Sequence, residues 1–137
     1  MNAEELMAGH KAFVDHEARD AMYKTATFLV NYFWYNPAEL SNSLGVLLLT
    51  WNQAFYRYGS FDYDELETCI VKNKDTLQGY RNRNILSYTS ADDVHIIGLY
   101  EAFLAALQIA GGKSAGRRSP VSASKALHLM APEFFPL

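Results

Sequence analysis

The sequence predicts an all-α fold of six to eight helices in one domain. Apolar residues recur at helical spacing along most of the chain, whereas the alternation typical of strands is scarce. Of the 137 residues, 50% are hydrophobic and 20% are charged, so a buried core is expected and general disorder is not. Asn36–Pro37 and Ser119–Pro120 are strong helix-start signals, because Asn and Ser cap helices and Pro suits the first helical position.

Residues 3–35 are expected to form one long helix or two helices in series. Gly9 and the polar cluster at residues 15–17 are the weak points where such a helix would break. The apolar stripe near a period of 3.6 consists of Leu6, Phe13, Val14, Met22, Ala26, Leu29 and Phe33.

The next helix is expected at residues 43–58, in the centre of the fold. Its first half is apolar on nearly every side, which is typical of a buried helix. A start signal at Ser41 or Asn42 follows the one at Asn36, and Gly59 is a good terminator.

A short helix is expected after Asp62, which can cap it. Leu66, Cys69 and Ile70 then lie on one face of that helix. Residues 75–88 fit no single element, and Gly79 favours a turn there.

The carboxy-terminal third predicts a helix–hairpin–helix at about residues 91–131. Ser90 can cap the first helix, residues 91–109, and Gly111–Gly112 would end it. Ser119–Pro120 opens the second helix, which Pro132 closes. The first helix is expected to bury Val94, Ile97, Tyr100, Leu104 and Leu107.

We expect residues 1–137 to be a single domain, with amino-terminal helices at 1–36 and a helical core at 37–137. The longest unbroken apolar run, residues 46–49, is far too short to span a membrane, and the acidic amino terminus lacks an apolar signal core. Cys69 is the only cysteine, which excludes an internal disulfide and a cysteine-based zinc cluster. A cytoplasmic protein without membrane contact is the expectation.

The charge distribution permits one local anion-binding face on an acidic chain. The formal net charge is −3 and the pI is about 5.7, which argues against coating nucleic acid through bulk charge. The hairpin region has no acidic residue between positions 111 and 131, and unpaired N–H groups at the following helix start also attract phosphate. Alternatively, the cations only keep the hairpin tip soluble. The four cations are Lys113, Arg117, Arg118 and Lys125.

Residues 119–132 read SPVSASKALHLMAP, and FFPL follows at 134–137. This segment resembles the hairpin and following helix of the helix-hairpin-helix DNA glycosylase superfamily, and the resemblance extends over residues 44–137. It implies that double-stranded DNA is the partner and that polar residues at the end of the central helix approach the damaged base. The implied phosphate contacts are Lys113, Arg117, Arg118, Ser119, Val121 and Lys125. The implied base pocket consists of Trp34, Trp51, Asn52 and Gln53.

The chain departs from the family pattern at three places. Residues 120–122 keep only the hydrophobic residue of the usual Gly-hydrophobic-Gly turn. Ser124 stands where lyase-competent members carry lysine, and Lys125 would face about 100° further round the helix. The family's catalytic aspartate has no counterpart before Leu137. A complete version would hydrolyse the N-glycosidic bond of a damaged base, and this chain is expected to bind without catalysis.

Several other residues are candidates for a base pocket, a catalytic group or a metal ligand. Trp34, Tyr35, Trp51 and Tyr56 can line a pocket for an extruded base, although most of the aromatic cluster is expected in the core. His128 is expected to be a hydrogen-bonded, partly buried side chain, and Cys69 an inert buried thiol. The polar residues His10, Asp15, His16, Glu17 and Asp20 are expected to form a solvated face, without a metal or cofactor.

A second function stays open: a helical protein–protein interaction module without catalysis. The acidic pI and the missing Gly-rich hairpin favour it. The tail carries Phe134, Phe135 and Leu137, and prolines at 132 and 136 favour extended geometry there. Because an extended tail places these side chains on two sides, self-association through the tail is expected.

Overall fold

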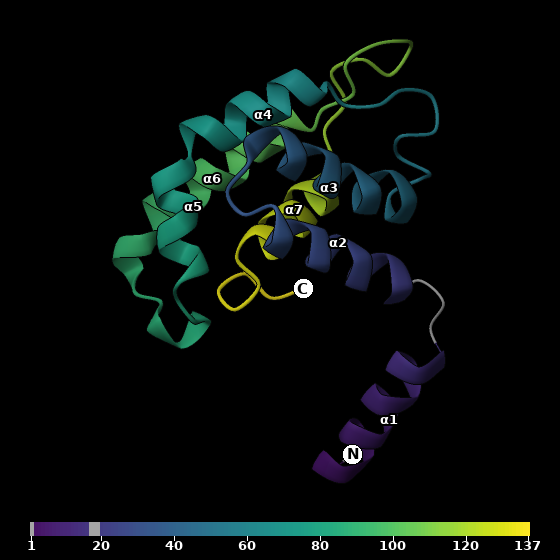
Figure 1. The fold of residues 1–137 in the computed structure, drawn as a ribbon, viewed down its shortest axis with the longest axis vertical. Coiled ribbons are helices and arrows are strands. Elements are labelled where there is room, and N and C mark those ends of the chain that lie inside the picture. Colours follow the sequence, from purple (N-terminus) through teal and green to yellow (C-terminus); the bar gives the residue numbers. More distant parts are fainter. Residues whose placement is uncertain (1, 17–19) are drawn as a thin grey trace.

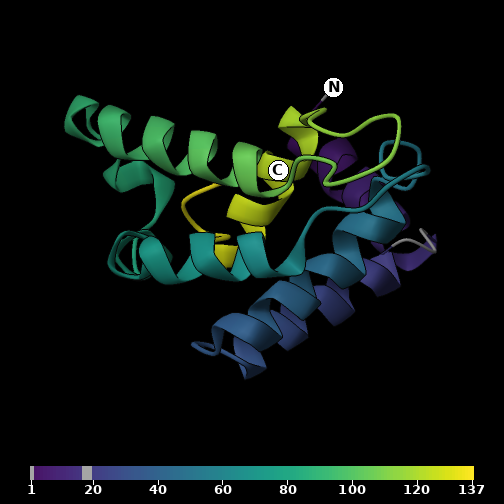
Figure 2. The same ribbon diagram turned by 90° about the horizontal axis from the view of Figure 1, so that it is seen from above.

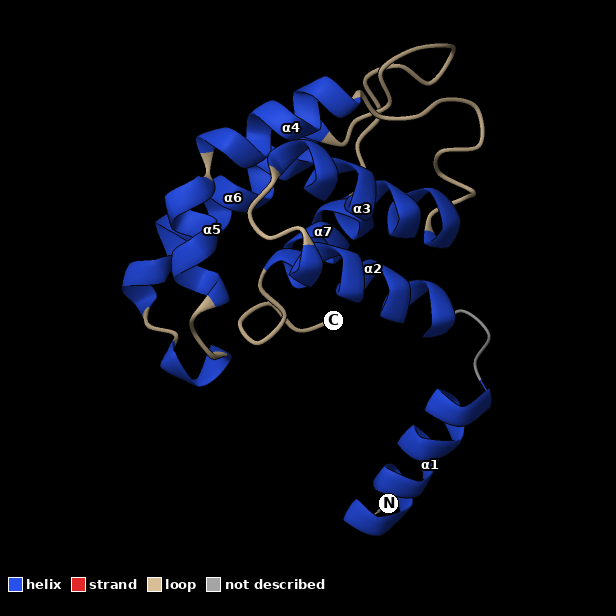
Figure 3. Cartoon of the chain, in the orientation of Figure 1, coloured by secondary structure: helices blue, strands red, loops and turns tan. Residues whose placement is uncertain are grey.

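The computed structural model describes residues 2–16 and 20–137 of the chain, and the side chains of 2–11 and 21–137. Helices and loops make up the whole of these described ranges, which contain no strand (Figures 1 and 3). The prediction of an all-α fold with six to eight helices is confirmed. The elements are α1 (Ala3–His16), α2 (Asp20–Tyr32), α3 (Pro37–Trp51), α4 (Tyr63–Lys72), α5 (Lys74–Arg81), the 3-10 turns η1 (Ile85–Ser87) and η2 (Ser90–Asp92), α6 (Asp93–Ala106) and α7 (Pro120–Met130).

Helix α3 is the central element, as the sequence predicted. It contacts α2, α4 and α7, and its side chains Leu40, Leu44, Leu47 and Leu48 are fully buried. Figure 2 shows α2 and α3 side by side, with α4 and α6 on the other side and α7 in the middle. The end of α3 and the start of α7 therefore meet inside the molecule.

The predicted boundaries of the central helix, residues 43–58, are wrong at both ends. The helix begins at the earlier signal, because the Asn36 side chain accepts a hydrogen bond from the Glu39 N–H at 3.3 Å and Pro37 occupies the first position. It ends at Trp51, where the backbone folds into turns and the Asn52 carbonyl accepts from the N–H groups of Phe55 and Tyr56.

The segment after Asp62 is partly as expected. The Asp62 side chain caps α4 by accepting from Asp64 N–H at 2.8 Å, and Leu66, Cys69 and Ile70 are buried. The expected turn at Gly79 is wrong, because α5 runs through it.

The predicted position of helix α6 is correct, and its predicted buried face is correct only in part. It follows η2, whose capping residue Thr89 and third residue Asp92 form a capping box. Leu107 is buried, as expected, and so are Leu99 and Phe103, whereas the exposed fractions of Val94 and Ile97 are 71% and 56%. Apolar residues lie on nearly every side of this helix, so periodicity alone cannot select the face that packs.

Helix α7 begins and ends as predicted, and the tail folds back. Ser119 caps the helix, which stops at Met130 before Pro132. The tail turns instead of extending, with the N–H of Phe135 donating to the Ala131 carbonyl at 2.9 Å. Phe134 is 1% exposed and Phe135 is half-buried, so Leu137 at 64% is the tail's exposed large side chain.

Helices α1 and α2 are separate, and α1 lies apart from the other helices in Figure 1. The side chains of residues 2–11 are all exposed, Leu6 and Met7 included. Within the described part of the chain, none of the helices is long and apolar enough to cross a bilayer.

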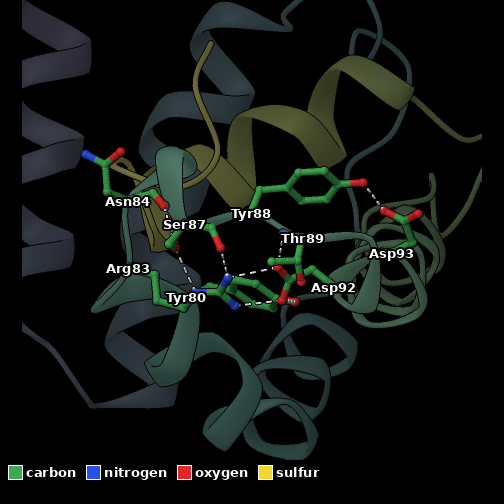
Figure 4. A network of polar contacts seen from close by, with 8 residues as sticks. All are labelled: Tyr80, Arg83, Asn84, Ser87, Tyr88, Thr89, Asp92 and Asp93. Carbon is green, nitrogen blue, oxygen red and sulfur yellow. Dashed lines mark hydrogen bonds and ion pairs between the residues drawn. The ribbon is translucent and has the colours of Figure 1, made fainter.

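A polar network fixes the corner between α5 and α6 (Figure 4). The Arg83 guanidinium donates to both Asp92 carboxylate oxygens, at 2.6 and 2.8 Å, and also to the Ser87 carbonyl. Tyr80 Oη and the Thr89 N–H donate to the same carboxylate at 3.1 and 2.9 Å. The hydrogen bonds from Arg83 and Thr89 hold the pKa of Asp92 below its usual range.

Candidate nucleic-acid interface

Two loops meet at one end of the molecule, residues 52–61 after α3 and residues 107–119 before α7 (Figures 1 and 3). The Ala110 N–H donates to the Ser60 carbonyl at 2.9 Å, and Tyr56 Oη donates to the Leu107 carbonyl at 2.7 Å. We call this surface the two-loop face. Its two halves are far apart in sequence and are joined by hydrogen bonds.

Glycine allows the close approach of the two loops. A Cβ atom on Gly59 would lie 2.8 Å from the Gly111 carbonyl oxygen, closer than side chains come to backbone. Gly116 has a φ of +85°, and its N–H donates to the Ile109 carbonyl at 2.7 Å. The shape of the two-loop face is therefore set by backbone contacts.

The two-loop face carries four exposed cations and, in sequence, no Asp or Glu. The Arg117 guanidinium lies 5.8 Å from the centre of the Phe55 ring. Tyr58, with an exposed fraction of 73%, places an aromatic ring among the cations. Positive charge with interspersed aromatic rings is typical of nucleic-acid-binding surfaces. The four cations are Arg57, Lys113, Arg117 and Arg118.

Beside this face, three predicted site residues come together. Lys125 Nζ donates to Asn52 Oδ1 at 2.6 Å and lies 5.1 Å from the centre of the Trp51 ring. Asn52 Nδ2 donates to Ser122 Oγ at 2.6 Å. Both halves of the buried Asn52 amide are thus used to join the end of α3 to the start of α7.

An aromatic stack extends this cluster toward the tail. Tyr23 stacks on Trp51 and on His128, with ring centres 5.8 and 5.6 Å apart. His128 Nδ1 lies 2.7 Å from the Phe135 carbonyl, which can only accept, so Nδ1 carries a proton. In the neutral ring Nε2 then accepts from Tyr23 Oη at 2.6 Å. The expected hydrogen bonding of His128 is confirmed, and the side chain is buried, more fully than the partial burial that was expected.

The start of α7 has fewer free backbone N–H groups for a phosphate than an uncapped helix would have. Ser119 is buried, and its Oγ accepts from the Ser122 N–H at 3.1 Å. Pro120 has no N–H, so among the first three helical positions only Val121 has an N–H that this cap does not use. Phosphate binding at this end would depend mainly on the cations of the adjacent loop.

Of the remaining predicted site residues, Trp34 lies away from the two-loop face, and Gln53 and Arg118 lie on it. Trp34 is separate from Trp51: its Nε1 donates to Gln78 Oε1 at 2.6 Å, and Arg81 lies 4.1 Å over its ring. Gln53 is exposed at the start of the two-loop face. Arg118 Nε donates to Gln108 Oε1 at 3.2 Å.

Two residues of the face, Arg57 and Tyr58, were not predicted from the sequence. Both fall within the helix expected at residues 43–58, which ends at residue 51 in the structure. The available signal was the absence of acidic residues from positions 51–61, which matches the acid-free stretch at positions 111–131.

Cys69 is buried, as expected, and burial raises the pKa of its thiol to about 11. His10 is exposed, and the other polar residues weighed as metal ligands, at positions 15–17 and 20, lie outside the described side chains. Among the side chains that are described, no three His, Cys, Asp or Glu residues converge on a common point.

No protein-family model matches this sequence, and no curated protein or solved structure matches it either. The described part of the chain is all-α and carries a group of exposed cations on the two-loop face, in a protein of net charge −3. The resemblance to helix-hairpin-helix DNA glycosylases stays a prediction.

Proposed function

We propose that this protein binds double-stranded DNA through the two-loop face, as a relative of the helix-hairpin-helix DNA glycosylases. The observation that carries the proposal is the gathering of Arg57, Lys113, Arg117 and Arg118 on two acid-free loops. Because the net charge of the chain is −3, the rest of the chain carries a net negative charge, which disfavours phosphate. DNA would therefore bind at this end of the molecule in preference to others.

The position of the face supports a role for the end of α3 in contacting a base. Trp51 ends α3 and Gln53 is exposed at the start of the first loop, whereas the Asn52 between them is buried and its amide is already hydrogen-bonded to Ser122 and Lys125. A base extruded from a duplex bound across the two loops would meet this aromatic and amide surface. Tyr58 adds an exposed ring that can stack on an unpaired base.

Salt dependence of duplex binding tests the proposal. We would measure the affinity of an undamaged duplex and of a duplex with an abasic-site analogue by fluorescence anisotropy across a salt series. Each phosphate contact contributes about −0.9 to the slope of log affinity against log salt. Replacing Arg117 and Arg118 with Gln should weaken binding by about tenfold or more and reduce the slope by about 2.

The matched control removes the same charge elsewhere. Lys11 lies on α1 and Lys72 on α4, both exposed and outside the two loops. The Lys11→Gln, Lys72→Gln variant should bind like the unchanged protein. A flat salt slope, no binding at low salt, or an equal loss in the control variant would contradict the proposal.

Incubation with duplexes that carry damaged bases tests the catalytic half of the resemblance separately. Release of a free base, measured by chromatography, would extend the proposal from binding to N-glycosidic hydrolysis. Binding without base release would limit it to recognition.

A further inference from the structure

An apolar groove opens between α6, α7, η1 and the tail, and it encloses about 450 Å³. Ile97 and Tyr100 line it from α6, Leu127 from α7 and Phe135 from the tail. Ser124 is the only residue lining it whose side chain is neither apolar nor aromatic. The groove is lined by residues 96–100 of α6, and the loop at residues 107–119 follows the end of that helix.

The apolar surface continues beyond the groove. Leu86, Val94 and Ile97 have exposed fractions of 92%, 71% and 56%. They lie on η1 and on the outer side of α6, which the other helices leave uncovered. Large apolar side chains that are exposed on the elements around a groove are typical of interaction sites on soluble proteins.

The walls of the groove are held in place before any partner binds. The Ile85 N–H donates to the Glu133 carbonyl at 2.9 Å, which ties η1 to the tail. Tyr88 Oη donates to Asp93 at the start of α6, and the ion pair of Arg83 with Asp92 holds the same corner (Figure 4). A preformed groove loses less conformational entropy on binding than a mobile one.

The elements that form the groove carry exposed carboxylates, which we take as its acidic rim: Asp93, Glu101 and Glu133. The Arg83 guanidinium lies 4.9 Å from the centre of the Phe134 ring, and its charge is paired with Asp92. Residues 85–106 and 131–137 contain no Lys or Arg. Lys125 follows Ser124 on α7, but its ammonium group is directed to Asn52.

We propose that this groove docks an amphipathic helix of a partner protein, one that presents large apolar side chains flanked by Lys or Arg. The apolar lining fits the anchors, and the carboxylates of the rim complement the basic flanks. A second copy fits less well, because a two-fold interface would place the acidic rims against each other. The chain's own α1 begins with Glu4 and Glu5 and would meet the same repulsion.

Designed peptides test both the apolar and the charged parts of this proposal. The probe is a fluorescent amphipathic peptide of about 18 residues, with Leu at i, i+3, i+4 and i+7 spacing and Lys elsewhere. The matched peptide has Glu in place of every Lys. The Lys peptide should bind with a Kd below about 100 μM, and the Glu peptide at least about tenfold more weakly.

Three variants locate the binding site. Ile97→Ser should weaken the Lys peptide by about tenfold. Val71→Ser is the matched control, because Val71 is 54% exposed on α4, away from the groove, and its replacement should change nothing. Glu101→Lys should weaken the Lys peptide and strengthen the Glu peptide. Equal binding of the two peptides, no binding of either, or an unchanged affinity in Ile97→Ser would overturn the proposal. So would a stable homodimer that Ile97→Ser dissociates.

Discussion

Asp92 connects three parts of the chain through one carboxylate. It accepts hydrogen bonds from Arg83, from Tyr80 and from the backbone at Thr89, and it lies directly before α6. Its pKa is lowered chiefly by the hydrogen bonds from Arg83, with a further contribution from the Thr89 N–H. This corner also carries Tyr88, which lines the apolar groove.

Replacing Asp92 with Asn should destabilise the protein in a pH-dependent way. A carboxylate whose pKa is lower in the folded state stabilises the fold above its unfolded pKa, about 3.9, and loses this effect as the pH falls through the folded value. The urea midpoint of Asp92→Asn should therefore be clearly below that of the unchanged protein at about pH 7. The difference should shrink progressively below about pH 4.

The control for this measurement is Glu101→Gln, which neutralises an exposed carboxylate on α6. Its urea midpoint should stay close to that of the unchanged protein. A difference for Asp92→Asn that is constant with pH would show that the network contributes through shape and not through charge.

Among the elements, α7 depends most clearly on a single cap. Ser119 Oγ accepts from the Ser122 N–H, and Ser122 in turn accepts from Asn52 on α3. Ser119→Ala should lower the free energy of unfolding by about 1 kcal/mol, because one amide at the helix start loses its acceptor. Ser119→Asn keeps an acceptor and should cost less. Chemical denaturation measures both, and an equal loss in the two variants would show that packing matters more than capping.

Helix-start signals are local and could be found in the sequence, although the central helix begins at the earlier of its two signals and not at residue 43 as expected. Asn36 with Pro37, Asp62, and Ser119 with Pro120 each begin a helix through a side chain that caps it within three residues. Helix ends and buried faces could not be predicted in the same way. Helix α3 stops at Trp51, and the next residue, Asn52, bonds with Ser122 and Lys125, about seventy residues later.

The residues of the candidate site could likewise be predicted where the signal is local in sequence, and not where it depends on contacts between distant segments. The carboxy-terminal cations and the residues around Asn52 were predicted from charge and from the family resemblance. Arg57 and Tyr58 were missed, because only the folded chain brings residues 52–61 beside residues 107–119. Trp34 was expected in the base pocket, and it lies against Gln78 and Arg81 instead.

The whole molecule separates two kinds of surface along α6. The two-loop face beyond its end is basic, and the groove near its start is apolar with an acidic rim. Binding at the first should weaken as salt rises, because phosphate contacts release counterions. Ligands of the two surfaces should therefore not compete for one site. The two-loop face is proposed to bind an anion, DNA, and the groove is proposed to bind a basic helix.

The contribution of the tail to self-association depends on how the whole chain folds. Phe134 is buried within the chain, so Leu137 is the large tail side chain left to drive association. Burying one leucine contributes only about 1.5–3 kcal/mol. A single side chain also covers far less than the area of about 800 Å² per partner that is typical of a stable interface. The acidic groove rims further oppose pairing of two copies, and salt would screen that repulsion. We expect a monomer in sedimentation velocity at low salt, with any dimer increasing as salt is added. A dimer at low salt that Leu137→Ser dissociates would instead establish the tail as the interface.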